Sequence, residues 1–114
     1  MDLDELAQRI SAASHDPVVQ RLVTILREWK HDETTVVELR ESVERYLGNS
    51  WIESTNEHED VYAQWSKFRE ETINLIDGMT MNERLSSFGL FRLFDACETD
   101  DDRARLYSKL LASP

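Results

Sequence analysis

The side chains that could bind a metal or carry acid–base chemistry are three histidines, His15, His31 and His58, together with the many carboxylates of the chain. Glu28 and His31 have the Glu-x-x-His spacing with which di-iron helical bundles present two ligands from adjacent turns. Such a centre needs two of these pairs, but the positions three residues before His15 and His58 hold alanine and threonine, which supply no carboxylate. We therefore expect no metal centre and no cofactor, and we interpret His31 as a solvent-exposed residue at a helix end.

His58 lies among Glu57, Glu59 and Asp60, whose oxygen atoms are the ligands that hard cations prefer. The ordered spacing and the glycine of a calcium-binding loop are missing. Negative side chains in the first turn of a helix are stabilised by the helix dipole. We interpret these residues as the charged start of a helix.

Nucleophilic catalysis lacks the residues that it needs. The single cysteine, Cys97, lies in the most apolar stretch of the chain, where a buried thiol packs as a small hydrophobic group and is inert. The chain contains no glycine-rich phosphate loop, no Gly-x-Ser-x-Gly turn and no His-Glu-x-x-His run. One cysteine also excludes an internal disulfide and a multi-cysteine zinc site. The sequence predicts a protein that is not an enzyme, with a metal-dependent helical enzyme using Glu28 and His31 as the alternative.

Two dense groups of carboxylates are the clearest functional feature. The first comprises Glu53, Glu57, Glu59 and Asp60, and the second comprises Asp95, Glu98, Asp100, Asp101 and Asp102. One explanation is helix capping combined with solubility. The other is a docking surface for a basic partner, because attraction between opposite charges raises the rate of association.

Trp51 and Ile52 precede the first carboxylate group, in a segment that we expect to connect two helices. An aromatic side chain rimmed by charge is typical of an interface anchor. The alternative is that Trp51 folds back onto the core. The candidate partner-binding residues are therefore Trp51, Glu53, Glu57, Glu59, Asp60, Asp100, Asp101 and Asp102.

Composition limits the classes of partner. The chain has 114 residues, of which 23 are acidic and 13 basic, and its net charge is -10. Nucleic acids and anionic membranes are themselves negatively charged, so we expect neither as a partner. The start of the chain, Met1–Glu5, is acidic where a signal peptide is basic, and no apolar run reaches the roughly 20 residues of a membrane span. We expect one cytoplasmic domain over residues 1–114.

Apolar residues recur at intervals of three and four, and only three glycines and two prolines occur. This pattern predicts an all-α protein, a single compact bundle of five to six helices. After a first helix that carries Leu3, Leu6 and Ile10, the expected N-cap residues are Asp16, Thr35, Ser54, Thr80 and Thr99. The expected apolar stripe of the second helix is Val18, Leu22, Ile25 and Trp29, flanked by Val19 and Leu26. The third helix is expected to end at Gly48 and Asn49, which both tolerate the left-handed conformation.

The second half of the chain is predicted to contain a long fourth helix and an unusually apolar fifth helix. The fourth is expected to run about five turns, with a buried face of Val61, Trp65, Phe68, Thr72 and Leu75 that is widened by Tyr62, Ile73 and Ile76. From Thr80 to Cys97 the apolar residues run nearly all round a single predicted helix, in which Gly89 allows a close crossing. The expected main core is Trp65, Phe68, Leu85, Phe88 and Phe91.

The segment from Gly78 to Ala112 carries the run Met79-Thr80-Met81-Asn82-Glu83-Arg84-Leu85, followed by Gly89-Leu90 and Phe94-Asp95. This segment resembles one found in small, uncharacterised bacterial helical proteins. The resemblance covers about a third of the chain and implies a helical fold. It implies no activity, because those proteins have none that can be transferred to residues of this chain.

Size, acidity and the lack of catalytic residues together favour a non-catalytic domain that binds another protein. We expect a bacterial inhibitor or immunity-type protein that covers the substrate groove of a basic enzyme, such as a nuclease toxin, with carboxylates. A regulatory adaptor and a structural homodimer that uses the apolar fifth helix fit the same observations.

Overall fold

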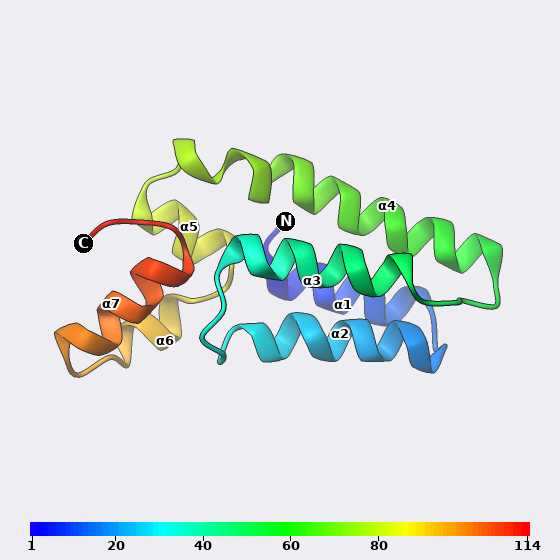
Figure 1. Ribbon diagram of the computed structural model, residues 1–114, viewed down its shortest axis with the longest axis horizontal. Helices are drawn as coiled ribbons and strands as arrows, with labels where there is room; N and C mark the ends of the chain where they lie inside the picture. The colour runs from blue at the N-terminus through cyan, green and yellow to red at the C-terminus, as the bar shows by residue number, and fades with distance from the viewer.

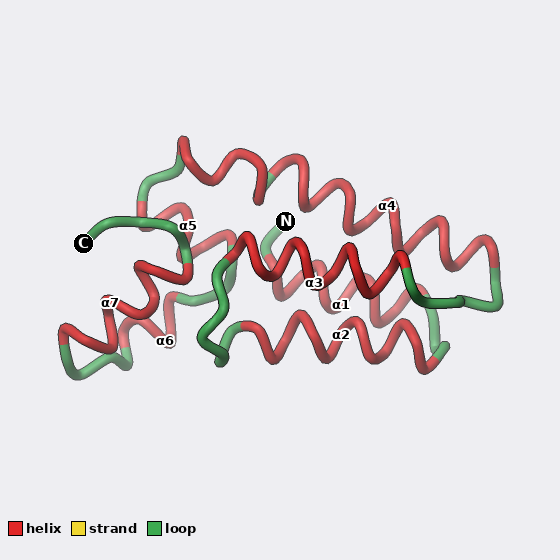
Figure 2. Tube along the Cα trace, viewed as in Figure 1, coloured by secondary structure: helices red, strands yellow, loops and turns green.

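The structure is a computed structural model that describes all 114 residues, with seven α-helices, one 3-10 helix and no strand (Figures 1 and 2). The elements are α1 (Leu3–Ala13), α2 (Pro17–Trp29), α3 (Val36–Gly48), α4 (Thr55–Glu71), the 3-10 helix η1 (Ile73–Gly78), α5 (Met81–Ser87), α6 (Phe91–Asp95) and α7 (Asp100–Lys109). The predicted all-α class is confirmed. The predicted number of five to six helices is too low, because the expected fifth helix is two helices and the end of the fourth is η1.

The four long helices form an elongated body, and the whole molecule measures 46 × 25 × 21 Å along its principal axes. α1 packs against both α2 and α4, and α3 packs against α2. Figure 1 shows these helices running side by side along the long axis, with α5, α6 and α7 gathered at one end. The two ends of the molecule are therefore built from different parts of the chain.

Side-chain caps set where the helices begin, as the sequence predicts. Asp16 accepts a hydrogen bond from the backbone N–H of Val18 (2.9 Å), and Pro17 occupies the first helical position of α2. Reciprocal capping boxes open α3 and α5, and single side-chain caps open α4 and α7. In the α5 box the backbone N–H of Thr80 donates to Glu83 (3.0 Å), which lowers the pKa of that carboxyl. All five predicted N-caps are confirmed.

The end of α3 is correctly placed at Gly48, but its expected conformation is wrong. Asn49, the C-cap residue, has φ −110°, and Gly48 is not left-handed either. The last carbonyls are capped instead by the side-chain amide of Asn49, which donates to Arg45 O (2.9 Å), and by the hydroxyl of Ser50. Polar side chains satisfy this terminus without a left-handed residue.

The buried face of α2 keeps Leu22, Trp29 and the predicted flanking residues Val19 and Leu26, but not Val18 or Ile25. Its buried residues are Val19, Leu22, Val23, Leu26 and Trp29. Val18 and Ile25 are only half-buried, and Ile25 lines a surface groove between α2 and α3. The centre of the buried face of α2 is therefore shifted by about one residue from the predicted stripe. The groove leaves the side of α2 next to α3 partly open to solvent.

The expected five-turn helix ends its α-helical part at Glu71 and continues as η1. A 3-10 helix turns by about 120° per residue instead of 100°, so the face predicted from α-helical spacing no longer applies after Thr72. Ile73 and Ile76 are buried as predicted, whereas Leu75 is 59% exposed, and Tyr62 at the other edge of the predicted face is 45% exposed. The prediction of Leu75 as a buried residue is wrong for this reason.

The predicted helix from Thr80 to Cys97 is broken at Gly89, which has φ +65°. The backbone N–H of Leu90 donates to Leu85 O (2.9 Å) and that of Gly89 donates to Ser86 O (3.3 Å), the hydrogen-bond pattern of a Schellman motif. Leu85 and Leu90 are both buried and complete the hydrophobic contact of that motif. Gly89 is therefore a helix terminator and not the mid-helix residue that we expected.

The core is a single cluster of 24 buried hydrophobic residues to which every helix except α6 contributes. Phe88 lies at its centre, with ring centroids 5.6 Å from Trp29 and 5.7 Å from Phe68. Trp65, Phe68, Leu85 and Phe88 are buried as predicted. Phe91 is 40% exposed, and its predicted place in the core is wrong, because α6 starts anew after the break at Gly89 and packs Leu93 and Phe94 against the core instead.

α7 is attached to the α2–α3 connection by a buried lysine. Lys109 is 3% exposed, and its ammonium donates to Asp32 Oδ1 (2.8 Å), Asp32 O (3.0 Å) and Thr34 O (2.8 Å). The ammonium also lies 4.0 Å from the centre of the Trp29 ring. Burial lowers the pKa of Lys109, and the Asp32 carboxylate opposes that effect. Because each ammonium proton has an acceptor, the buried charge is compensated.

Candidate docking surface

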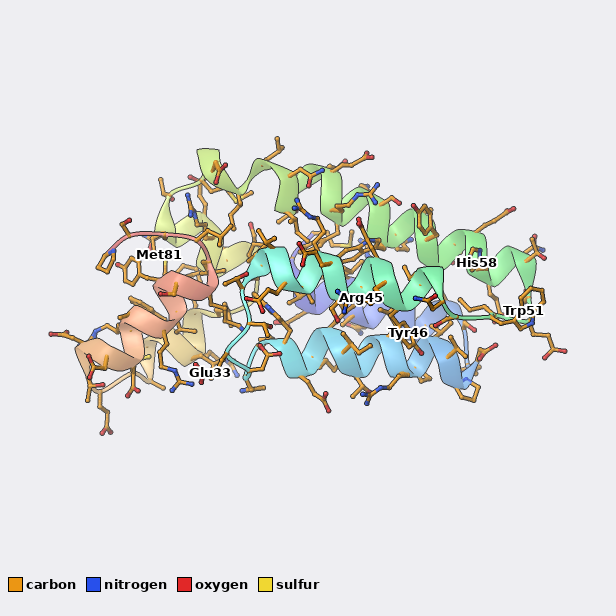
Figure 3. All side chains as sticks on the ribbon, in the orientation of Figure 1. Glu33, Arg45, Tyr46, Trp51, His58 and Met81 are labelled. Atoms are coloured by element: carbon orange, nitrogen blue, oxygen red, sulfur yellow. The ribbon has the colours of Figure 1, made fainter.

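The α3–α4 connection carries the most exposed of the large hydrophobic side chains, Trp51. Trp51 is 82% exposed, whereas its neighbour Ile52 is only 6% exposed and belongs to the core. In an extended segment successive side chains point to opposite sides, so burying Ile52 directs Trp51 outward. Figure 3 shows Trp51 at the end of the molecule opposite α6 and α7. Of the two predicted possibilities for Trp51, the structure therefore shows the exposed one.

The α3–α4 connection lies against the α1–α2 junction. The backbone N–H of Glu53 donates to Asp16 Oδ2 (3.4 Å), and the hydroxyl of Tyr46 donates to Val18 O (2.7 Å). A hollow of about 370 Å³ lies between the two connections and is lined only by polar side chains and a proline, from His15, Asp16, Pro17, Glu53, Ser54 and Glu57. Asp16 thus joins the first carboxylate group. Its 37-residue separation from Glu53 kept it out of the sequence prediction.

No salt bridge neutralises the carboxylates at this end. The ion pairs of the molecule involve Asp4, Asp32, Glu33, Glu44, Glu70 and Asp100. Glu53, Glu57, Glu59 and Asp60 have no cationic partner within 4 Å. Their charge is therefore available to attract a cationic group from outside.

The four predicted carboxylates do not all face the same way. Glu57 is half-buried and lines the hollow, and its backbone N–H donates to Ser54 (3.3 Å). Glu59 and Asp60 are exposed. Each residue of an α-helix is rotated about 100° from the one before, which places Glu59 on the side of α4 opposite buried Val61. Glu53 and Glu57 border the hollow, while Glu59 and Asp60 extend the negative charge over the outer surface of α4.

The second carboxylate group lies at the other end of the molecule. Asp100, Asp101 and Asp102 form the first turn of α7, where Thr99 accepts a hydrogen bond from the backbone N–H of Asp102 (3.1 Å). Asp100 forms an ion pair with Arg103 (3.6 Å). Figure 1 shows the start of α7, in orange, at the opposite end from the α3–α4 connection. The structure does not bring the two groups together, so they cannot form one surface.

Of the other chemistry-bearing residues, His58 lies within this surface, whereas Glu28, His31 and Cys97 lie outside it. Glu28 and His31 are both exposed, and no group of three or more histidine, cysteine, aspartate or glutamate residues is placed to hold a metal ion. His58 stacks on Tyr62 at the next turn of α4, with ring centroids 6.5 Å apart. Cys97 follows α6 and packs against the core, and its thiol donates to Leu93 O (3.1 Å). It is only half-buried, so the expectation of a buried thiol is wrong, because the chain leaves α6 at Asp95 and places Cys97 beside a surface hollow.

No helix of the structure combines the length and the apolar character that crossing a membrane requires. No known protein family matches the chain, and no curated protein and no solved structure is significantly similar to it. The resemblance of residues 78–112 to bacterial helical proteins accordingly stays a prediction.

Proposed function

We propose that this chain is a non-catalytic domain that docks the Trp51 end of its helical body onto a basic protein. The proposal names Trp51 as the central contact and the carboxylates of Glu53, Glu57, Glu59 and Asp60 as its charged surroundings. A bacterial inhibitor or immunity-type role, in which these residues cover the cationic substrate groove of an enzyme such as a nuclease toxin, fits this arrangement.

The exposed position of Trp51 is the observation that carries the proposal. The other two tryptophans, Trp29 and Trp65, are at most 2% exposed, so this protein can bury aromatic side chains. Leaving one in water forgoes about 2 kcal/mol or more of burial free energy. Tryptophan is among the residues most enriched at the energetic centres of protein interfaces.

The unpaired carboxylates specify the chemistry of the partner. Charges at the rim of an interface act mainly on the rate of encounter and on the exclusion of wrongly charged partners. Lysine and arginine side chains on the partner would supply the cations that Glu53 and Glu57 lack within this chain. The proposal therefore requires a basic partner with an apolar site that admits an indole ring.

A regulatory adaptor would bind its partner through the same surface. Only the identity of that partner would distinguish an adaptor from an inhibitor. The homodimer alternative rested on a continuous apolar fifth helix, and the structure divides that segment into α5 and α6. We therefore retain the homodimer only as an outcome of the test below.

The test is affinity capture from cells of the source organism, using the wild-type chain, Trp51→Ser and the matched control Leu75→Ser. Leu75 is also an exposed apolar residue, at 59%, but lies on η1 away from the α3–α4 connection. We expect wild type and Leu75→Ser to retain a basic protein that Trp51→Ser loses. With the purified partner, loss of a central tryptophan should weaken Kd by about 30-fold or more.

Three outcomes would overturn the proposal. They are equal binding by Trp51→Ser and wild type, an acidic partner, and recovery of only a second copy of this chain. Circular dichroism spectra and melting temperatures of all three proteins must agree, so that a lost partner reports lost contact and not lost fold.

A further inference from the structure

A second hollow, of about 310 Å³, lies at the opposite end of the molecule, where the end of α2 meets α6 and α7. Its apolar lining comes from Leu93, Ala96 and Leu106. This volume is at the lower end of the range of small-molecule sites in proteins. Trp51 and its carboxylates take no part in this hollow, so whatever binds here is independent of the proposed docking surface.

Three nitrogen-bearing side chains in the lining have N–H groups without an acceptor. The Nε and Nη2 atoms of Arg105 donate to Glu33, which leaves Nη1 unused. The ammonium of Lys30 binds the two oxygens of Asp4 (3.0 and 3.2 Å), and its third proton has no acceptor. The imidazole of His31 makes no hydrogen bond within the chain. These are donors that an anionic group can use.

Cationic side chains line the hollow, and two of the carboxylates that bind them lie outside its lining. Asp4 and Glu33 bind Lys30 and Arg105, but neither carboxylate lines the hollow. The ammonium of Lys109, which also belongs to the lining, is fully engaged by the α2–α3 connection. The one carboxylate in the lining is Asp102. In a chain of net charge -10, this is a concave site whose wall is mainly cationic.

We propose that this hollow binds a small amphipathic carboxylate. The ligand's carboxylate accepts hydrogen bonds from the imidazole of His31 and from the unused Nη1 of Arg105, because both N–H groups match carboxylate oxygens. Its short apolar chain packs against Leu93, Ala96 and Leu106. A carboxylate is preferred to an alcohol because hydrogen bonds from a cationic donor to an anion are about twice as strong as neutral ones, and an ammonium has no acceptor for these donors.

Cys97 lines the same hollow and is the only cysteine of the chain, so its alkylation reports whether the site is occupied. The experiment measures the rate at which iodoacetamide, a neutral reagent, modifies Cys97 of the full chain, by intact-mass spectrometry. The probes are hexanoate, hexan-1-ol and hexylamine at equal concentrations up to about 10 mM, since ligands of this size have weak affinities. We expect hexanoate to slow alkylation severalfold and the alcohol and the amine to have little effect.

Substitutions test the placement of the carboxylate. His31→Ala and Arg105→Gln should abolish the protection by hexanoate, whereas Asp102→Asn, which removes the one like charge, should strengthen it severalfold. Arg21→Gln is the control, because Arg21 is an exposed cation on α2 outside the hollow. Melting temperatures verify that each variant folds.

Two results would overturn the proposal: equal alkylation rates with and without hexanoate, and equal protection by all three probes. Protection that survives in both His31→Ala and Arg105→Gln would also overturn it. The Trp51→Ser variant should be protected as wild type is, so that failure of the docking proposal leaves this result unaffected.

Discussion

Trp51 and Ile52 are adjacent in sequence, and their side chains lie in opposite environments, one in water and one in the core. Composition cannot distinguish them, because both are large and apolar. The distinction arises when the α3–α4 connection packs against the α1–α2 junction and selects Ile52 as the residue to bury. For this reason the sequence left two possibilities open for Trp51.

The exposure of Trp51 predicts how tryptophan fluorescence is quenched. Acrylamide should quench only the emission of Trp51, because the other two tryptophans, Trp29 and Trp65, are buried. At low ionic strength, and relative to its quenching of free N-acetyltryptophanamide, Cs⁺ should quench this emission more strongly than I⁻ does, since the nearby carboxylates attract cations and repel anions. The Trp51→Phe variant, as the control, should lose the quenchable emission while keeping its melting temperature. Emission that acrylamide cannot quench in wild type, or a higher relative quenching by I⁻ than by Cs⁺, would contradict the placement of Trp51 beside unpaired carboxylates.

At the scale of elements, the Schellman motif at Gly89 divides the apolar segment into α5 and α6. A Cβ at this position would require a left-handed alanine and would overlap the carboxylate of Asp4. We predict that Gly89→Ala lowers the free energy of unfolding by about 1–2 kcal/mol, measured by urea denaturation.

Gly78→Ala is the matched control for that prediction. Gly78 also lies at the end of a helical segment, as the last residue of η1, but its φ is not left-handed and no atom lies within 4 Å of an added Cβ. We expect it to leave the free energy of unfolding unchanged or to raise it by up to about 1 kcal/mol. Equal effects of the two substitutions would show that Gly89 is not held in the left-handed conformation.

The attachment of α7 to the α2–α3 connection should make stability depend on pH through Asp32. Burial raises the pKa of Asp32, but hydrogen bonds from Lys109 and Thr34 outweigh it and lower the pKa below its ordinary value of 3.8. The unfolded chain then binds more protons than the folded one in this range, so the stabilisation is present above about pH 4. It is lost as the pH falls through the lowered pKa of the folded state.

We therefore predict that Asp32→Asn reduces the fall in unfolding free energy between pH 5 and about pH 2.5, measured by urea denaturation at several pH values. At pH 7 the same variant should be less stable than wild type, because Lys109 then remains buried without its carboxylate. Glu41→Gln, which changes an exposed carboxylate outside every ion pair, is the control and should follow the wild-type curve. An Asp32→Asn curve parallel to that of wild type would show that the contact does not perturb Asp32.

The helix starts could be predicted because capping is local: a residue such as Thr35 and its partner Glu38 lie within four positions of one another. The break at Gly89 was missed because apolar periodicity looks similar in one long helix and in two short ones. The role of Lys109 was missed because its acceptors, Asp32 and Thr34, lie more than 70 residues away in sequence. Asp16 was missed as part of the candidate site for the same reason.

At the scale of the whole molecule, the 46 Å length separates the two carboxylate groups. The sequence allowed both to contact one partner, whereas the structure places the α3–α4 connection at one end and the start of α7 at the other (Figure 1). The charge at α7 is partly compensated by Arg103, and the charge beside Trp51 is not. We therefore propose docking at the Trp51 end, and we interpret the aspartates at the start of α7 as charges that stabilise the helix dipole.

The most direct test of this assignment is the association rate of the captured basic partner, measured by stopped flow at low and at physiological ionic strength. One variant combines Glu53→Gln, Glu57→Gln and Asp60→Asn, and its matched control combines Asp100→Asn, Asp101→Asn and Asp102→Asn, so both change the net charge equally. At low salt we predict that the first slows association by about 10-fold and weakens its salt dependence, while the control associates nearly as fast as wild type. Equal rates for all three proteins, or a larger loss in the control, would contradict docking at the Trp51 end.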